Sequence, residues 1–172
     1  MNNRSLSLSL CLLLMMMFGS FSSVLAQDVP DTDFDSFLKK FTSGAEFQYS
    51  RVKFPIATPI FLIKANGDEQ EAPFTMEEWP LLEAKDVRVF KQSTQDGVMF
   101  GRFTVKDKDH VEYEAGLEES ELDLSITFDL IDGKWYVTDC FNGIYGSVST
   151  EEFDAVVYEI QQKNADYQKK HP

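Results

Sequence analysis

The sequence predicts an α+β domain in which a curved antiparallel sheet packs on N- and C-terminal helices. Three observations lead to this prediction. Apolar residues recur at helical spacing near both ends of the chain, they alternate with polar residues over positions 122–130, and an Asp-Gly pair follows that alternation. Helices that flank a run of antiparallel strands bury one face of the sheet, which is the layering of α+β proteins.

The first helix is expected to begin at residue 33. Its apolar side chains recur at helical spacing and share one face: Phe34, Phe37, Leu38 and Phe41. Asp31 or Thr32 is expected to cap this helix. Lys39 and Lys40 suit the negative end of the helix dipole, and Gly44 follows as a stop signal.

Strands and a loop are predicted next. Aromatic and β-branched residues over 47–54, ended by Pro55, favour extended backbone, and so does the apolar run 60–63. Residues 75–82 are expected to form a covering loop, because Pro80 would interrupt a helix after its first turn.

Two further strands are predicted over 98–105 and 110–115, joined by a charged turn. The most regular pattern follows at 122–130, where apolar and polar side chains alternate as in a half-buried strand. Asp132-Gly133 suits a type I′ turn, which would bring residues 134–141 back as the partner strand.

The two-residue turn fixes the register expected for this hairpin. It sets Ile131 opposite Lys134, and the core-facing pairs follow in order: Leu130 with Trp135, Phe128 with Val137, Ile126 with Asp139, and Leu124 with Phe141. Asp139 would then be the only carboxylate on the core side of the hairpin. Tyr136 and Cys140 would lie on the opposite, polar face.

A C-terminal helix is predicted after Ser149 and Glu152, which form a capping-box pair. Its apolar residues again have helical spacing: Phe153, Val156, Val157 and Ile160. The expected organisation is a signal peptide over 1–26, a flexible leader over 27–32, a single domain over 33–165 and a frayed tail over 166–172.

The first 26 residues are expected to be a cleavable signal peptide. Arg4 precedes an apolar run, and Ala26 suits the last position read by signal peptidase, so cleavage is expected before Gln27. A membrane anchor is an alternative, but the run is shorter than the roughly 20 residues that span a bilayer. Cys11 raises a lipoprotein alternative, although no small residue precedes it. The mature protein would reach the periplasm or the cell surface.

Charge and cysteine content restrict the partners. The net charge of −13 would become −14 once Arg4 is lost with the signal peptide. Such a charge repels nucleic acid and anionic membrane surfaces, so neither is expected as a partner. Only Cys140 would remain after processing, so no intrachain disulfide is expected.

Three stretches carry a family resemblance: Phe34-Asp35-Ser36-Phe37, Phe47-Gln48-Tyr49-Ser50-Arg51-Val52-Lys53-Phe54-Pro55 and Asp132-Gly133-Lys134-Trp135-Tyr136. With them, most of the mature chain resembles an exported bacterial family known as domain of unknown function 4348. The resemblance implies the cone-shaped fold shared by nuclear transport factor two and ketosteroid isomerase, in which a bent sheet wraps helices around a pocket. It implies no catalytic residues, because that family has no established activity.

Asp139 is the leading candidate for a pocket residue. An ionised carboxylate in an apolar interior requires a partner, so on the core side Asp139 would bind a polar ligand group or act as a general base. Alternatively, a bulge turns it outward, or Arg51, Lys53 or a tyrosine satisfies it. The expected ligand-pocket residues are Asp139, Arg51, Tyr49, Trp135 and Phe141.

Other motifs lack the companions that their chemistry needs. His110-Val111-Glu112 resembles half of a zinc deaminase signature, but the Pro-Cys-x-x-Cys half does not occur. The chain has only two histidines, His110 and the near-terminal His171, so no metal, cofactor or Ser-His-Asp triad is expected. His110 is expected to be an exposed turn residue.

Three functions are therefore compatible with the sequence. The first is a non-catalytic module of the cell envelope that binds a small molecule or assists another protein. The second is a small ketosteroid-isomerase-like enzyme with Asp139 as acid or base and Tyr49 or Tyr136 as hydrogen-bond donor. The third is a protein-interaction module that forms a homodimer through an exposed face of the sheet.

Overall fold

The structure is a computed structural model that describes residues 31–120 and 122–171. The expected signal peptide and most of the expected leader lie outside these residues. The elements follow in the order α2 (Phe34–Phe41), α3 (Ala45–Ser50), β1 (Ile60–Ile63), β2 (Glu69–Ala72), β3 (Phe90–Ser93), β4 (Val98–Lys106), β5 (His110–Leu117), β6 (Leu122–Ile131), β7 (Lys134–Asn142), η1 (Gly143–Tyr145) and α4 (Phe153–Lys170).

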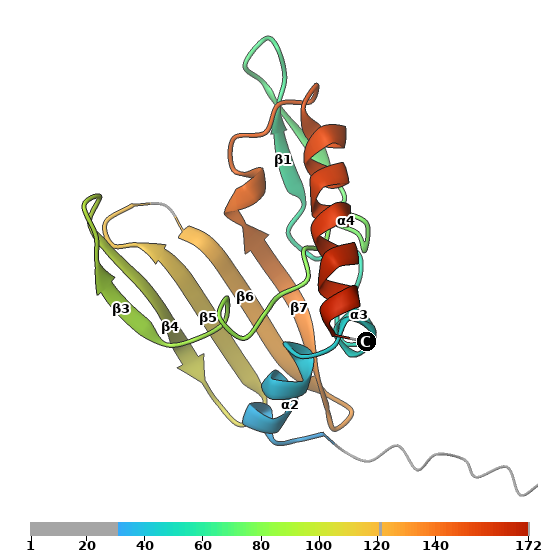
Figure 1. Ribbon diagram of the computed structural model, residues 1–172, viewed down its shortest axis with the longest axis vertical. Helices are drawn as coiled ribbons and strands as arrows, with labels where there is room; N and C mark the ends of the chain where they lie inside the picture. Colours follow the sequence, from blue (N-terminus) through green and yellow to red (C-terminus); the bar gives the residue numbers. More distant parts are fainter. Residues whose placement is uncertain (1–30, 121, 172) are drawn as a thin grey trace, which may run out of the picture.

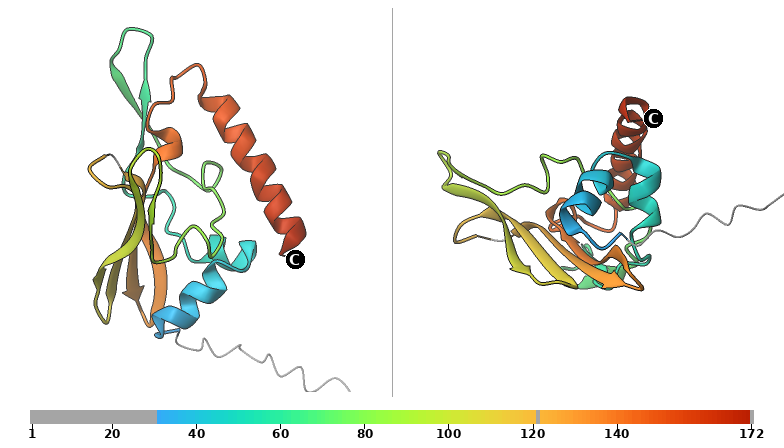
Figure 2. Two further views of the ribbon diagram at one scale, coloured as in Figure 1. Left: turned by 60° about the vertical axis from the view of Figure 1, so that its left-hand side comes forward. Right: turned by 90° about the horizontal axis from the view of Figure 1, so that it is seen from below.

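The main sheet has five antiparallel strands in the order β3-β4-β5-β6-β7, and β1 pairs with β2 in a separate hairpin. The main sheet is curved, and α2 and α3 lie across one end of its concave side (Figures 1 and 2). The α4 helix stands farther away, and the segment between β2 and β3 runs between it and the sheet (Figure 2). We call this segment, residues 73–89, the covering segment.

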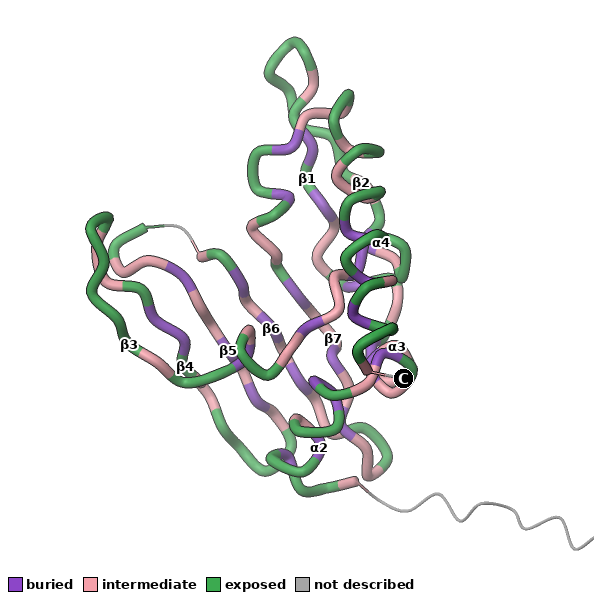
Figure 3. Tube along the Cα trace, viewed as in Figure 1, coloured by how far each residue is buried: buried purple, intermediate pink, exposed green. Residues whose placement is uncertain are grey.

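The core lies on the concave side of the main sheet. Buried and less buried residues alternate along β5, β6 and β7, as a sheet with one covered face requires (Figure 3). The helix α2 buries Phe34, Phe37 and Phe41 against them. The Phe34 ring packs edge-on against Phe128 and Trp135, with centroid distances of 5.3 and 5.1 Å.

A fully buried glutamine holds the covering segment in place. Gln48 of α3 donates through Nε2 to the carbonyl oxygens of Phe41 and Leu82, at 2.8 and 3.1 Å. Its Oε1 accepts from the indole N–H of Trp79 and the backbone N–H of Leu82, at 3.0 and 2.8 Å. From the other side, Asn164 of α4 accepts from Leu81 N and donates to the Trp79 carbonyl, both at 2.8 Å. The polar groups of these two side chains are thus satisfied inside the core.

Most of the expected elements are confirmed. The α+β class, the two terminal helices and the strands expected over 60–63, 98–105, 110–115, 122–130 and 134–141 are present, some with longer bounds. Asp132 and Gly133 both have positive φ, 50° and 77°, as a type I′ turn requires. Residues 75–82 contain no helix or strand, in agreement with the predicted loop.

The strand expected over 47–54 is wrong, because residues 45–50 form α3. Ala45 and Gln48, the buried residues of this stretch, are three positions apart and share a helical face, whereas a strand would alternate. Extended backbone begins only after the helix, where Val52 pairs with Val137. The N-cap of α2 is Asp33, whose carboxylate accepts from Ser36 N, and not Asp31 or Thr32. The elements β2, β3 and η1 were not predicted.

Both ends of the described chain are more ordered than expected. The α4 helix continues through residues 166–170, where a frayed tail was expected. Asp31, at the end of the expected leader, donates its backbone N–H to the Gly133 carbonyl at 2.9 Å. Within residues 31–120 and 122–171, no helix is both long and apolar enough to cross a membrane.

Candidate functional site

A bulge in the β6–β7 hairpin changes the faces predicted for the end of β7. The expected pairs hold as far as Phe128 with Val137, but the register then shifts so that Thr127 pairs with Asp139. Cys140, expected on the polar face, consequently faces the core and is buried. Phe141, expected in the core, pairs with Ser125 and is 39% exposed. The alternative in which a bulge turns Asp139 out of the core is the correct one.

Asp139 is held by the segment beside β7. Its Oδ1 accepts from the backbone N–H groups of Thr58 and Cys140, and its Oδ2 accepts from the Thr58 hydroxyl, all at 2.9 Å. Among the described residues, Asp139 forms no hydrogen bond or ion pair with Arg51, Lys53 or a tyrosine, which were expected as possible partners. Three donors on one carboxylate describe a structural junction and leave little capacity for proton transfer.

The other residues expected in the pocket are dispersed. Trp135 is buried in the aromatic core, and its indole N–H donates to the Thr32 carbonyl at 3.1 Å. The Tyr49 hydroxyl accepts from Asn164 Nδ2 at 3.3 Å, and burial raises the pKa of this phenol. The Arg51 guanidinium lies over the rings of Phe47 and Tyr136.

A cavity of about 400 Å³ is lined by the end of β7 together with residues of β1 and η1. Figure 1 shows β1 beside the end of β7. Phe141 is the one residue of the expected pocket set that lines the cavity. The wall is largely apolar and comes from four parts of the chain: Thr58, Pro59, Ile60, Phe61, Phe74, Leu122, Cys140, Phe141, Asn142, Tyr145 and Gly146. The apolar run of β1 was visible in the sequence, but nothing there placed it beside the end of β7.

The polar groups of the cavity wall are neutral or already bonded. Burial, and secondarily the Asp139 charge, raises the pKa of the Cys140 thiol far above its ordinary value. Burial also raises the pKa of the Tyr145 hydroxyl, which donates to the Glu78 carbonyl at 2.5 Å. Asn142 Oδ1 accepts from Ile144 N. A protonated thiol is a poor nucleophile, so this wall suits binding of an apolar group better than covalent chemistry.

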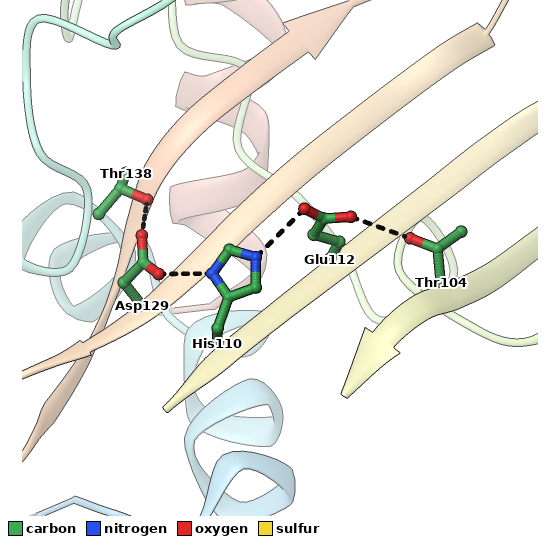
Figure 4. Close-up of polar contacts among 5 residues, drawn as sticks. All are labelled: Thr104, His110, Glu112, Asp129 and Thr138. Atoms are coloured by element: carbon green, nitrogen blue, oxygen red, sulfur yellow. Dashed lines mark hydrogen bonds and ion pairs between the residues drawn. The ribbon is translucent and has the colours of Figure 1, made fainter. Parts of the chain in front are cut away.

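A second polar cluster spans β4 to β7 on the face of the main sheet that is turned away from the core (Figure 4). His110 Nδ1 lies 2.7 Å from Asp129 Oδ1, and Nε2 lies 3.1 Å from Glu112 Oε1. Asp129 also accepts from the Thr138 hydroxyl, and Glu112 from the Thr104 hydroxyl. His110 was expected to be an exposed turn residue; it is the half-buried first residue of β5, directly after the turn, and it joins two carboxylates.

This cluster does not have the arrangement of a Ser-His-Asp triad. The bonds to Asp129 and Glu112, in that order of size, raise the pKa of His110, so the imidazolium form that donates from both nitrogens is favoured. No hydroxyl or thiol is bonded to the ring, because Thr138 reaches only Asp129, so a nucleophile is missing. Over the described part of the chain, no group of three or more His, Cys, Asp or Glu side chains is arranged to hold a metal ion.

Comparisons with known proteins agree with this fold. A family model, whose description states only a likeness ("-like") and no activity, matches residues 32–168. A crystal structure of a cystatin-like protein from Bacteroides caccae is 42% identical, with a TM-score of 0.78 over 81% of this chain and 95% of that one. No curated protein gave a match.

Two solution structures are similar to the same extent. An NMR structure of a protein from Bacteroides uniformis is 43% identical, with a TM-score of 0.77 over 81% of this chain and 97% of that one. An NMR structure of a protein from Bacteroides ovatus is 44% identical, with a TM-score of 0.76 over 81% and 93%. The chain belongs to the same family as these α+β Bacteroides proteins, one of which is described as cystatin-like, and neither the family description nor these relatives indicate a catalytic function.

Proposed function

We propose that this protein is a non-catalytic binding module of the cell envelope that takes an apolar small molecule into the cavity at the end of β7. The observation that carries the proposal is the cavity itself, about 400 Å³ with a largely apolar wall. Ligand pockets typically measure roughly 300–1,000 Å³ and combine apolar walls with a few polar groups. Thr58 and Asn142 would supply those polar groups here.

We also propose that the module is exported and begins at Gln27, and that its sheet and helices form the cone-shaped fold of domain of unknown function 4348. Support for the cone comes from the curvature of the sheet around α2 (Figure 2). Support for export comes from the sequence of residues 1–26. Mass spectrometry of the protein purified from its native host tests the cleavage site. A measured mass that differs from that of a chain beginning at Gln27 would contradict it.

The isomerase alternative has less support than the binding module. A general base must be oriented toward the substrate, but the three hydrogen bonds from Thr58 and Cys140 fix the Asp139 carboxylate against the segment beside β7 and stabilise its charged form. The cavity wall supplies a protonated thiol and a bonded tyrosine in its place.

Ligand uptake can be measured with N-phenyl-1-naphthylamine, a neutral apolar dye whose fluorescence rises in apolar surroundings. Phe61 and Phe141 line the cavity and are 45% and 39% exposed, so each can be truncated at small cost to the core. Phe61→Ala and Phe141→Ala are each expected to weaken dye binding by about tenfold, through the loss of apolar contact area.

Tyr158→Ala is the matched control, because Tyr158 is a 63% exposed aromatic residue of α4 that lies outside the cavity wall. Its affinity for the dye should equal that of the unmodified protein. Equal affinity in all three variants would contradict binding in this cavity. A native mass spectrum with no dye adduct and the mass of a dimer would favour the homodimer in place of the binding module.

A further inference from the structure

A row of alternating cations and aromatic rings runs along the edge of the sheet next to β7. Lys40 Nζ lies 5.9 Å from the centre of the Phe47 ring, and the Arg51 guanidinium lies 5.0 Å from the same ring. The guanidinium is also 5.4 Å from the Tyr136 ring, which Lys53 Nζ approaches to 3.9 Å. Three positive groups from the end of α2, the end of α3 and the following segment are thus brought together by two rings.

Two of these cations have no carboxylate partner. Lys40 lies 3.7 Å from Asp31, but Arg51 and Lys53 make no ion pair within the described residues. Other cations of the same chain do find carboxylates, as Arg102 does with Glu114 and Lys91 with Glu118. Several other cations, Lys64 and Arg88 among them, also lack an ion pair within the described residues, so what distinguishes Arg51 and Lys53 is that both approach the same ring, that of Tyr136.

The carboxylate opposite Tyr136 on the neighbouring strand is engaged elsewhere. Asp129 is the cross-strand partner of Tyr136, but its two oxygens bind His110 and Thr138. Both positive groups, those of Arg51 and Lys53, therefore approach the Tyr136 ring, at 5.4 and 3.9 Å from its centre, without a counter-ion among the described residues. A bound anion would offset this local concentration of positive charge.

The geometry points to Arg51, Lys53 and Tyr136 as a binding site for a small oxyanion, either a carboxylate or a phosphate. A guanidinium presents parallel N–H groups that match both anions, and the contacts of Arg51 with the Phe47 and Tyr136 rings restrict its orientation before binding. The strongly negative net charge repels long polyanions at a distance, which favours a small ligand. None of these three residues lines the cavity at the end of β7, so the site stands independently of the proposed function.

The test is a titration of the ¹⁵N-labelled protein with sodium succinate and, separately, with sodium phosphate, at an ionic strength held constant with sodium chloride. We expect saturable changes in the amide shifts of residues 51–53 and 136–137. Arg51→Gln and Lys53→Gln should each weaken the apparent affinity by about tenfold, as expected for loss of a charge-assisted bond. Tighter binding of succinate assigns a carboxylate ligand, and tighter binding of phosphate assigns a phosphate.

Arg88→Gln is the matched control. Arg88 also lies over a ring, 5.2 Å from the centre of Phe90, but no second cation is recorded over that ring. Its affinity should equal that of the unmodified protein. Lys53 is exposed, so its variant keeps the test decisive even if Arg51→Gln fails to fold. Absence of saturable shifts with both anions, or equal weakening in Arg88→Gln, would overturn the proposal.

Discussion

The carboxylate of Asp139 accepts hydrogen bonds from both the backbone N–H and the hydroxyl of Thr58, each at 2.9 Å, although the two residues are 81 positions apart. These two hydrogen bonds attach Thr58 to the edge of β7 that pairs with no other strand of the main sheet. Two residues earlier on the same edge, Val137 exchanges backbone hydrogen bonds with Arg51 and Lys53 at 2.8 and 2.9 Å. The segment after α3 thus covers a sheet edge that would otherwise present unpaired backbone groups.

Removal of the Asp139 carboxylate should destabilise the fold. Asp139→Ala leaves two backbone N–H groups without an acceptor, so we expect the free energy of unfolding to fall by about 2–3 kcal/mol. Asp139→Asn keeps one acceptor oxygen for both N–H groups and should cost about 1 kcal/mol. Urea unfolding followed by circular dichroism measures both values. Asp123→Ala, at an exposed position of the neighbouring strand, should change stability by less than about 0.5 kcal/mol. Equal losses in the two alanine variants would show that the edge does not depend on this carboxylate.

The buried amide of Gln48 should be even less replaceable. Gln48→Met keeps a similar volume but leaves the Trp79 indole N–H, the Leu82 N–H and two carbonyl oxygens without their partner. We expect a loss of about 3–5 kcal/mol, together with a changed near-ultraviolet circular dichroism signal from Trp79. Gln161→Met, on the exposed face of α4, is the control. A stability close to that of this control would mean that the covering segment is held mainly by its apolar contacts.

The sequence predicted the structure well where apolar and polar residues recur at a single regular spacing. Over residues 122–130 of β6, apolar and polar residues alternate without exception, and Asp132-Gly133 is a pair typical of a type I′ turn, so strand, turn and initial register followed directly. The bulge beyond Val137 could not be predicted in the same way. Thr138 and Asp139 are both polar and Cys140 is small, so either register leaves a plausible set of residues facing the core.

The errors elsewhere have similar physical origins. The aromatic residues around Gln48 favour a strand locally, and the helix there depends on hydrogen bonds with the distant covering segment. The β2 strand reads Glu-Gln-Glu-Ala and has no apolar period, because it pairs only with β1 and is mostly exposed. The cavity and the row of cations each combine segments far apart in the chain, and composition alone does not bring these together.

Protonation of His110 should make stability depend on pH. Asp129 and then Glu112 raise the pKa of His110 in the folded state above its ordinary value of 6.5. The stabilisation is therefore fully present below about pH 6.5 and is lost as the pH rises through the raised pKa. His110→Gln should lack this loss, so its difference in unfolding free energy from the unmodified protein should shrink as the pH rises.

The effect should be at most about 1 kcal/mol, because the His110 side chain is 37% exposed and solvent screens its ion pairs. Urea midpoints at pH 5.5 and pH 9 measure it. His171→Gln, which removes the other histidine, should retain the pH dependence of the unmodified protein. A pH dependence that survives in His110→Gln but disappears in His171→Gln would contradict the assignment to this cluster.

The Cys140 thiol should be almost unreactive in the native protein. It is 2% exposed, and burial raises its pKa, so little thiolate forms at pH 8. Reaction with 5,5′-dithiobis(2-nitrobenzoic acid) should be at least about a hundredfold slower in buffer than in urea, because the anionic reagent reaches the thiol only when the structure around Cys140 opens locally. Cys140→Ser supplies the blank for any other thiol. Asp139→Ala should speed the reaction by weakening the closed edge beside Cys140, whereas Asp123→Ala should not. Rapid reaction in the unmodified protein would mean that the cavity admits a charged reagent to a thiolate, which is incompatible with the neutral, apolar wall on which the proposed binding function depends.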